Sequence, residues 1–225
     1  MGQPVTFPAN GHQASGYLAV PKSGSGPGVL IIQEWWGLVD HIRDLCDRFA
    51  DAGYLALAPD LYHGESTGSP DQAGKLFMAL NIDKAGVDLR GAADYLLKRR
   101  ECSSRKLGVV GFCMGGQLAL YAGMKYPERI GAVVDFYGIH PKVSIDPSQL
   151  KVPVLGHFGS RDESVSIAGA KSLADRVTQA GGSFEVHIYE ADHAFFNDSR
   201  PTVYNAEAAA LSWSRTVDFF RAHLS

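Results

Sequence analysis

The residue with the most evident chemistry is Cys113, which follows an apolar run and a glycine. The segment GVVGFCMGGQLA, residues 108–119, has the pattern of a buried strand, a tight turn and a helix. Many hydrolases present a nucleophile at such a bend, and Gly111 and Gly115 fit a turn too tight for side chains. A helix that begins at Met114 would direct free N–H groups and a positive dipole end at the bend, which stabilises a thiolate or an oxyanion. The segment therefore predicts that Cys113 is a nucleophile, the alternative being a buried structural cysteine.

A thiol nucleophile needs a base, and the base needs a carboxylate that orients it. His193 directly follows the last predicted strand, where a loop can carry its imidazole over the sheet edge; the rival, His187, lies inside that strand. Asp162 follows the preceding predicted strand in a glycine-containing turn, and it gives the chain order nucleophile, acid, histidine of the α/β-hydrolases. Asp135, late in an earlier strand, is the competing acid, and Asp162 could instead cap a helix. The expected triad is Cys113, His193 and Asp162.

Glu34 is unusual because an unbroken apolar strand, residues 28–33, delivers its carboxylate to the rim that carries Cys113. An unpaired charge would be costly there, so we expect Glu34 to hydrogen-bond the Cys113 thiol or a nearby arginine; the alternative is a loop salt bridge. In such folds the loop after this strand supplies one oxyanion donor. The backbone N–H of Trp35 is therefore expected to act together with that of Met114.

Strands alternate with helical patterns from about residue 28 onward, and this alternation must position these residues. Strands are expected at 28–33, 54–58, 106–112, 132–136, 152–158 and 184–189, and helices at about 38–52, 70–80, 83–100, 114 onward, 164–180 and 206–220. Such an order predicts an α/β fold with a mainly parallel central sheet and helices on both faces. Residues 15–20 could add an antiparallel edge, and residues 5–7 could begin a first strand. We expect one domain over residues 1–225, with its ligand site beyond the carboxyl ends of the strands.

The composition excludes several classes of function. The net charge is −3 over 225 residues with no basic stripe, so nucleic acid is not expected as a partner. No apolar stretch reaches the roughly 18 residues that span a bilayer, and the N-terminus lacks the layout of a secretory signal. Three cysteines without paired spacing fit a reducing compartment, so we expect a cytoplasmic protein without a membrane partner. The histidines show no spacing typical of metal ligands, and neither metal nor cofactor is expected.

Taken together, these residues resemble the dienelactone hydrolase family, also called carboxymethylenebutenolidases. The resemblance rests on QEWWG at 33–37, APDLY at 58–62, GFCMGG at 111–116, the Asp162 turn and the His193 loop. It implies an α/β-hydrolase in which Cys113, His193 and Asp162 form a triad. It also implies that Glu34 keeps the resting thiol neutral and shifts when substrate arrives. The short connection between residues 136 and 152 predicts that no large lid covers the site.

A cysteine nucleophile restricts the substrates that can be expected. A thiol has a pKa of about 8.5 against about 16 for water, so thiolate leaves more readily than alkoxide. A tetrahedral intermediate on sulfur therefore reverts unless the other leaving group is good, which favours enol lactones and aryl esters. In the family pattern an arginine four residues after the catalytic histidine helps to hold a substrate carboxylate. Asn197 stands there instead, residues 62–80 contain no arginine, and Arg200 and Lys75 are out of register.

Trp36, Tyr62, Phe195 and Phe196, with Asn197, could line a more apolar pocket, or could simply be packed in the core. The leading prediction is a hydrolase of small activated esters or lactones that acts through an acyl-cysteine. A general carboxylesterase or thioesterase on uncharged substrates is the alternative. A third reading is a non-catalytic redox-sensing or binding protein. That protein would need a resolving cysteine at the same rim, and the other two cysteines lie on predicted helices or beyond them.

Overall fold

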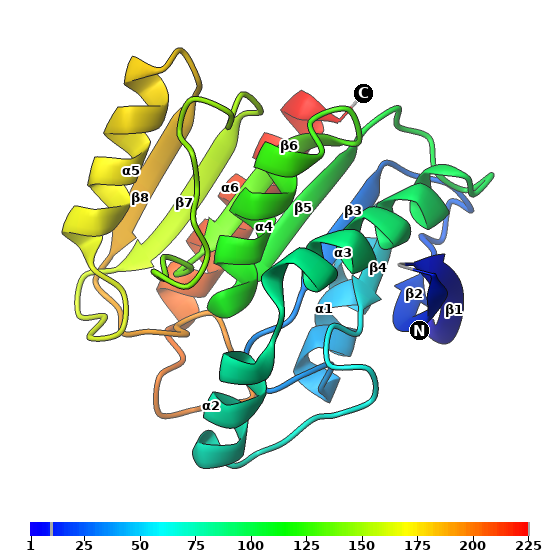
Figure 1. The fold of residues 1–225 in the computed structure, drawn as a ribbon, viewed down its shortest axis with the longest axis horizontal. Coiled ribbons are helices and arrows are strands. Elements are labelled where there is room, and N and C mark those ends of the chain that lie inside the picture. The colour runs from blue at the N-terminus through cyan, green and yellow to red at the C-terminus, as the bar shows by residue number, and fades with distance from the viewer. Residues whose placement is uncertain (10, 225) are drawn as a thin grey trace.

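The computed structural model describes residues 1–9 and 11–224. Eight strands in this part of the chain form one sheet in the order β1-β2-β4-β3-β5-β6-β7-β8 (Figure 1). The strands are β1 (Gln3–Ala9), β2 (His12–Ala19), β3 (Gly28–Ile32), β4 (Leu55–Pro59), β5 (Leu107–Phe112), β6 (Ile130–Phe136), β7 (Val154–Gly159) and β8 (Phe184–Tyr189). All pairs from β4 to β8 are parallel, whereas β2 runs antiparallel to β4 and to β1. The predicted α/β-hydrolase class is confirmed.

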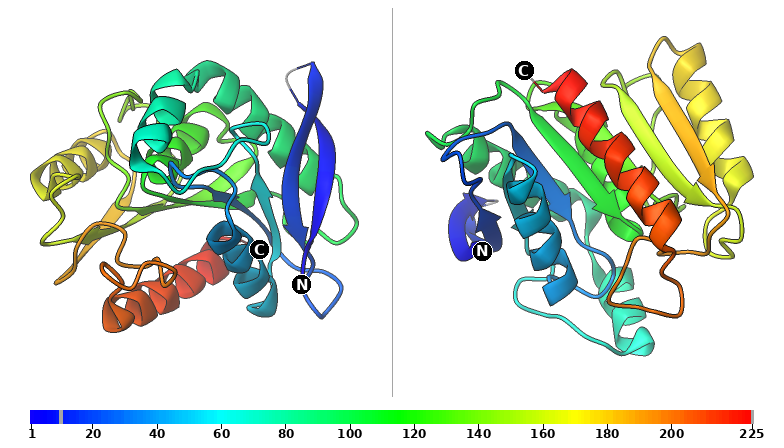
Figure 2. Two further views of the ribbon diagram at one scale, coloured as in Figure 1. Left: turned by 90° about the horizontal axis from the view of Figure 1, so that it is seen from below. Right: turned by 180° about the vertical axis from the view of Figure 1, so that it is seen from behind.

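The described residues form six helices. They are α1 (Asp40–Asp51), α2 (Pro70–Ala79), α3 (Ile82–Leu97), α4 (Met114–Lys125), α5 (Ile167–Gln179) and α6 (Ala206–His223). Five of them pack against strands of the sheet, whereas α2 lies below the sheet in Figure 1. Figure 1 shows α3 and α4 in front of the sheet, and the right-hand view of Figure 2 shows α1 and α6 on the opposite face. Among the described helices, none is long and apolar enough to cross a membrane.

The continuous apolar strands contribute side chains to two hydrophobic cores, one on each face of the sheet. In β3 the side chains of Val29 and Ile31 join the core under α1 and α6, whereas Leu30 and Ile32 join the core under α3 and α4. Side chains of a strand alternate between faces, so a strand buried on both sides must be apolar throughout. Each such side chain contributes roughly 1.5–3 kcal/mol by leaving water. This burial fixes the strand ends, where the polar residues emerge.

The predicted helices are present, although several begin or end a few residues away from the predicted positions. In α1 the predicted apolar face is buried, including Cys46, and Gly53 follows with a left-handed φ of 99° that suits a helix C-terminus. Helix α5 begins at Ile167, three residues later than expected. Its N-cap is Ser166, whose side chain accepts a hydrogen bond from the Gly169 N–H. The N-terminal edge is larger than expected because β1 pairs along the whole of β2.

Candidate active site

Cys113 lies at a strained bend between β5 and α4. Its φ of 56° and ψ of −122° are rarely adopted by a residue with a side chain and cost about 1–3 kcal/mol. The bend is tight: a Cβ on Gly111 would lie 1.9 Å from the Gly115 carbonyl oxygen, and one on Gly115 would lie 2.4 Å from that of Gln33. The Cys113 N–H donates to the carbonyl oxygen of Phe136 at 2.9 Å. The predicted requirement for glycine on both sides of the cysteine therefore has a direct steric cause.

His193 and Asp162 are joined as a pair beside this bend. The distance from His193 Nδ1 to Asp162 Oδ2 is 2.7 Å, and the Asp162 side chain is only 1% exposed. The other oxygen of that carboxylate accepts hydrogen bonds from the N–H groups of Ser164, at 2.7 Å, and Val165, at 2.9 Å. With both oxygens engaged, Asp162 is fixed in position and holds the imidazole in one orientation.

The protonation of His193 reflects its contacts with both partners. Burial alone would lower the pKa of His193, but its hydrogen bond with Asp162 and its interactions with the Cys113 side chain raise it to about 10. The imidazole therefore keeps its proton at neutral pH when the sulfur beside it is ionised. An imidazolium next to a thiolate is the arrangement that activates cysteine nucleophiles.

Glu34 is fully buried at the end of β3, next to the cavity. Its Oε2 accepts a hydrogen bond from Asn197 Nδ2 at 2.8 Å, whereas Oε1 has no hydrogen-bond partner among the described residues. Burial raises the pKa of Glu34, and the Asn197 hydrogen bond and the charges of His193 and Arg200 act against that rise. The expected hydrogen bond to the Cys113 thiol or to an arginine is thus not the one formed. The side-chain amide of Asn197, which lies in the loop that carries His193, forms the hydrogen bond to Glu34 instead.

A cavity of about 480 Å³ connects these groups. Its apolar wall includes Trp35, Trp36, Phe77, Ile139, Val165 and Val203. Its polar groups include Glu34, Cys113, His140, Ser164, His193 and Arg200. The volume suits a small molecule. Met114 also contributes to the wall, and its backbone N–H is among the first of α4, which have no partner inside the helix.

Comparison with known proteins places the chain in a family. The profile of the dienelactone hydrolase family matches residues 14–224. The Usf protein of Aquifex pyrophilus is 40% identical over the full length of both chains. A protein of Aquifex aeolicus, provisionally named carboxymethylenebutenolidase, is 36% identical, again over both full lengths.

The chain belongs to the dienelactone hydrolase family. It is accordingly a hydrolase. A crystal structure from Klebsiella pneumoniae, provisionally titled a dienelactone hydrolase, shares its fold with a TM-score of 0.88 at 30% identity, over 98% of each chain.

Four residues that the sequence suggested for the pocket do not line the cavity of this hydrolase. Phe195 is fully buried in the core against Tyr189, and Phe196 stacks on core aromatic rings rather than facing the cavity. Asn197 is buried, and its side-chain amide donates a hydrogen bond to Glu34. Tyr62 is buried too, and its hydroxyl donates a hydrogen bond to the sulfur of Met114 at 3.2 Å. Only Trp36 of the predicted set lies on the wall.

The rival candidates occupy other environments. The Asp135 carboxyl packs against the first turn of α4, since a Cβ on Gly116 would lie 2.0 Å from its Oδ1. Burial raises the pKa of Asp135 to about 8. His187 pairs with Glu185 at 2.7 Å and stacks on His157. Neither residue is hydrogen-bonded to the His193 imidazole in the way that Asp162 is.

Sequence reasoning missed Tyr137, and it considered Arg200 only as an out-of-register substitute for a family arginine; both lie on the cavity wall of the enzyme. The ring of Tyr137 meets the His193 ring edge-on at 5.1 Å, and its left-handed φ of 46° directs it there. Tyr137 directly follows β6, so the rule that ligand sites lie beyond strand ends could have found it. Arg200 lies in an irregular loop, with its guanidinium 5.3 Å from the Trp36 ring centre, so of the two out-of-register cations it is Arg200 that reaches the cavity. Lys75 is exposed on α2 and lies outside the cavity.

Proposed function

We propose that this enzyme hydrolyses small activated carboxylic esters or lactones through an acyl-cysteine intermediate on Cys113. The observation that supports this most strongly is the position of His193, which is hydrogen-bonded to Asp162 and lies with Cys113 on the wall of one cavity. A strained bend, an oriented imidazole and an adjoining cavity are the parts that acyl transfer requires.

In the first half of the reaction the Cys113 sulfur attacks the carbonyl carbon of the substrate. The carbonyl oxygen becomes an oxyanion, and we assign its stabilisation to the backbone N–H groups of Trp35 and Met114, since both residues line the cavity. The bond to the leaving oxygen then breaks, and the His193 imidazolium gives that oxygen its proton. The hydrogen bond with Asp162 favours the protonated imidazole, which makes it available as the acid in this step.

In the second half His193, now neutral, takes a proton from water. The resulting hydroxide attacks the acyl carbon, the carbon–sulfur bond breaks, and a carboxylic acid leaves. This leaves a thiolate beside an imidazolium, and transfer of the proton from the imidazolium to the sulfur restores the resting thiol. Asp162 keeps the imidazole in one orientation through these proton transfers, as its two engaged oxygens allow.

We assign Glu34 the role of a gatekeeper for the thiol. A carboxylate beside the sulfur disfavours a second negative charge there, which keeps the resting thiol neutral and protects it from oxidation. Asn197 anchors one carboxylate oxygen and leaves the other unpartnered. A group held by one hydrogen bond can shift when substrate enters the cavity, and the thiolate would form at that moment.

The cavity wall bears on the choice between two substrate classes. A guanidinium on Arg200 could hold the carboxylate of a dienelactone, because it is the arginine that lines the cavity. The many apolar side chains around it instead favour an uncharged ester or thioester, which is the second candidate.

The redox-sensor alternative lacks a partner thiol in the described residues. Cys46 is buried inside α1. The sulfur of Cys102 lies near Gly28, at the amino end of β3, whereas Cys113 follows the carboxyl end of β5. The three cysteines are free, and this supports the proposal that the enzyme works in the reducing cytoplasm.

Turnover of p-nitrophenyl acetate and of a dienelactone tests the proposed function. Cys113→Ala is expected to abolish both activities, because no other group can form the acyl intermediate, and Cys113→Ser is expected to lose most of them. Cys102→Ala is the matched control and keeps wild-type rates. Wild-type turnover by Cys113→Ala would overturn the covalent mechanism.

Replacing the cavity arginine separates the two substrate classes. If the substrate carries a carboxylate, Arg200→Met raises KM for the dienelactone by about 10-fold or more, since a charge-assisted contact is worth about 1.5–3 kcal/mol. KM for p-nitrophenyl acetate should stay within about 2-fold. Equal, small effects on both substrates would favour the uncharged class.

A further inference from the structure

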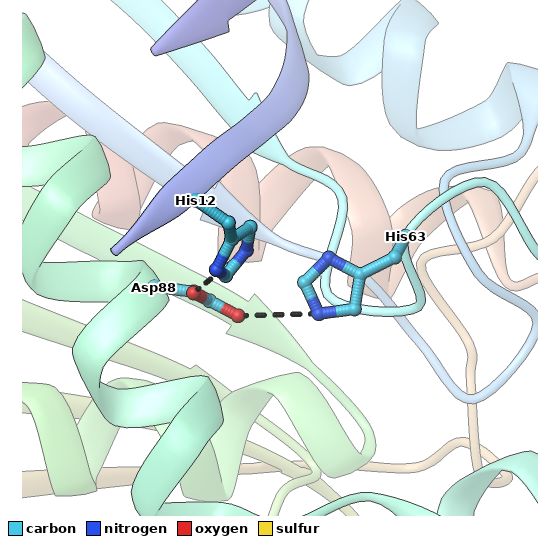
Figure 3. Close-up of side chains that lie close together, drawn as sticks. All are labelled: His12, His63 and Asp88. Carbon is cyan, nitrogen blue, oxygen red and sulfur yellow. Dashed lines mark ion pairs between the residues drawn. The ribbon is translucent and has the colours of Figure 1, made fainter. Parts of the chain in front are cut away.

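Three side chains from distant parts of the chain meet outside the catalytic cavity. They are His12 at the start of β2, His63 in the loop after β4 and Asp88 in α3 (Figure 3). Both imidazole rings reach toward the same carboxylate, and each faces a different oxygen of it. None of the three lines the catalytic cavity.

The Asp88 carboxylate is the unusual member of this cluster. Its side chain is 3% exposed, and its Oδ1 has no hydrogen-bond partner among the described residues. Removing a carboxylate from water without a firm partner is costly. The two imidazoles are about half exposed, at 40% and 51%, so the cluster has a buried anion at its base and an opening to solvent.

The spacing of the three groups suits a shared cation better than direct hydrogen bonds. His12 Nε2 lies 3.6 Å from Asp88 Oδ1, and His63 Nε2 lies 3.3 Å from Oδ2. Good N–H···O hydrogen bonds measure about 2.7–3.2 Å. Two ligands on one tetrahedral zinc ion, each about 2.1 Å from the metal, stand about 3.4 Å apart. One ligand atom from each residue lies within 4.8 Å of the others, so small rotations would complete the geometry.

The fold brings the N-terminal strands onto α3 at this point. Gly91 lies one turn after Asp88, and a Cβ there would be only 2.4 Å from the Cβ of Ala9. Helix α3 therefore packs closely against the end of β1, next to the start of β2. In the sheet, Gly16 pairs with Pro59, so His12 projects past the carboxyl end of β4.

The loop after β4 is held so that His63 meets the same place. The Asp60 carboxylate accepts hydrogen bonds from the N–H groups of Tyr62, at 3.1 Å, and Gly64, at 2.6 Å. His63 between them has a left-handed φ of 53°. These two hydrogen bonds fix the turn so that the imidazole of His63 faces Asp88 of α3.

We propose that His12, His63 and Asp88 bind one divalent transition-metal ion, with zinc the best fit and water in the remaining position. Two imidazole nitrogens and one carboxylate oxygen are a donor set that suits zinc, whereas magnesium and calcium prefer oxygen ligands throughout. The ion joins three elements: the N-terminal pair of strands, the loop after β4 and α3. The histidine spacing does not predict these ligands, because each of them comes from a different element.

The same metal site also touches the catalytic region indirectly. The loop that carries His63 continues to Ser66, which forms a bridge with Gly37, and Thr67 donates its N–H to the Trp36 carbonyl oxygen. Metal binding would therefore steady the segment behind one cavity wall. Its primary effect is on stability, since an ion that binds only the folded chain raises the melting temperature.

Calorimetric titration of the metal-stripped full-length protein with zinc chloride tests the site. Cys113, His193 and Asp162 together could also bind zinc, so every protein in the test carries Cys113→Ala. This background is expected to bind one zinc ion per chain with micromolar or tighter affinity and to gain melting temperature with zinc but not with magnesium. Adding His63→Ala should weaken binding by more than about 100-fold, since even outer-shell partners of a metal are worth 10–100-fold. Adding His223→Ala, an exposed histidine elsewhere, should change nothing.

Two results would overturn the proposal. One is the absence of zinc binding by the folded Cys113→Ala protein at millimolar zinc. The other is zinc binding that His63→Ala leaves intact. His63 is exposed, so this variant is expected to fold; Asp88→Asn, which keeps the side-chain shape, serves as a second test and should also abolish binding.

Discussion

At the scale of single residues, Cys113 depends on groups that the chain brings from four strand ends. The sulfur sits after β5, Glu34 after β3, Asp162 after β7 and His193 after β8. Cys113, Glu34 and Asp162 follow fully buried strands and His193 follows the partly exposed β8, and the sequence alone pointed to all four because each comes after a strand end. The partner of Glu34 could not be predicted in this way. Asn197 lies in an irregular loop, and only the folded loop brings its amide to the carboxylate.

Removing the charge of Glu34 tests its gatekeeper role. Glu34→Gln is expected to speed alkylation of Cys113 by iodoacetamide about 3–10-fold at pH 8, because a nearby carboxylate opposes formation of the thiolate. Burial raises the pKa of Glu34, so the carboxyl is neutral below that pKa and charged above it. The effect should therefore grow as the pH rises. Glu190→Gln, at an exposed ion pair with Arg161, is the control. An unchanged or slower alkylation rate in Glu34→Gln would contradict the gatekeeper role.

At the scale of elements, the close contact of α4 with β3 creates the bend. Hydrophobic periodicity was enough to predict β3, α1 and the strand–turn–helix around Cys113, because burial on two faces dictates those patterns. It could not place the cavity wall, since Tyr137 and Arg200 come from loops whose paths depend on long-range packing. The same limit explains why Phe195 and Phe196 were expected in the pocket: their apolar character suits a core equally well.

A single methyl group at the bend should disrupt it. Gly115→Ala would place a Cβ 2.4 Å from the Gln33 carbonyl oxygen, and backbone atoms cannot move aside cheaply. We expect a loss of about 2 kcal/mol or more in the free energy of unfolding in urea, with most esterase activity lost. Gly74→Ala in α2 is the control; nothing lies within 4 Å of its new Cβ, and it should stabilise by up to about 1 kcal/mol. A Gly115→Ala protein as stable and active as the wild type would contradict the steric account.

At the scale of the whole molecule, two apolar cores on either side of one sheet surround a few buried ionisable groups. Asp135 is fully buried behind the first turn of α4, and both of its carboxylate oxygens lack hydrogen-bond partners among the described residues. Burial raises its pKa from 3.8 to about 8. The folded state thus favours the neutral carboxyl. The unfolded chain ionises it at about pH 4, so stability from this group is fully present at acid pH and is lost as the pH rises toward 8.

Asp135→Asn should remove that pH dependence. The free energy of unfolding of the wild type should fall between pH 4 and pH 9, whereas that of the variant lacks this contribution because the amide cannot ionise. The difference between variant and wild type is therefore expected to shift by about 2–5 kcal/mol in favour of the variant over this range. Urea unfolding at the two pH values gives the difference directly. Asp175→Asn on the exposed face of α5 should show no such gain. Parallel pH profiles for the wild type and Asp135→Asn would show that the carboxyl does not titrate as its burial implies.

The acyl-cysteine is the central claim, and trapping it is the most direct test. The enzyme is mixed with saturating p-nitrophenyl acetate, quenched in acid within the first turnovers and digested for peptide mass spectrometry. The mass of one acetyl group is predicted on the peptide that contains Cys113, and the label should disappear as the substrate is consumed. Continued turnover with no acetyl group on Cys113 at any time, or with the label on Cys102 instead, would contradict the account.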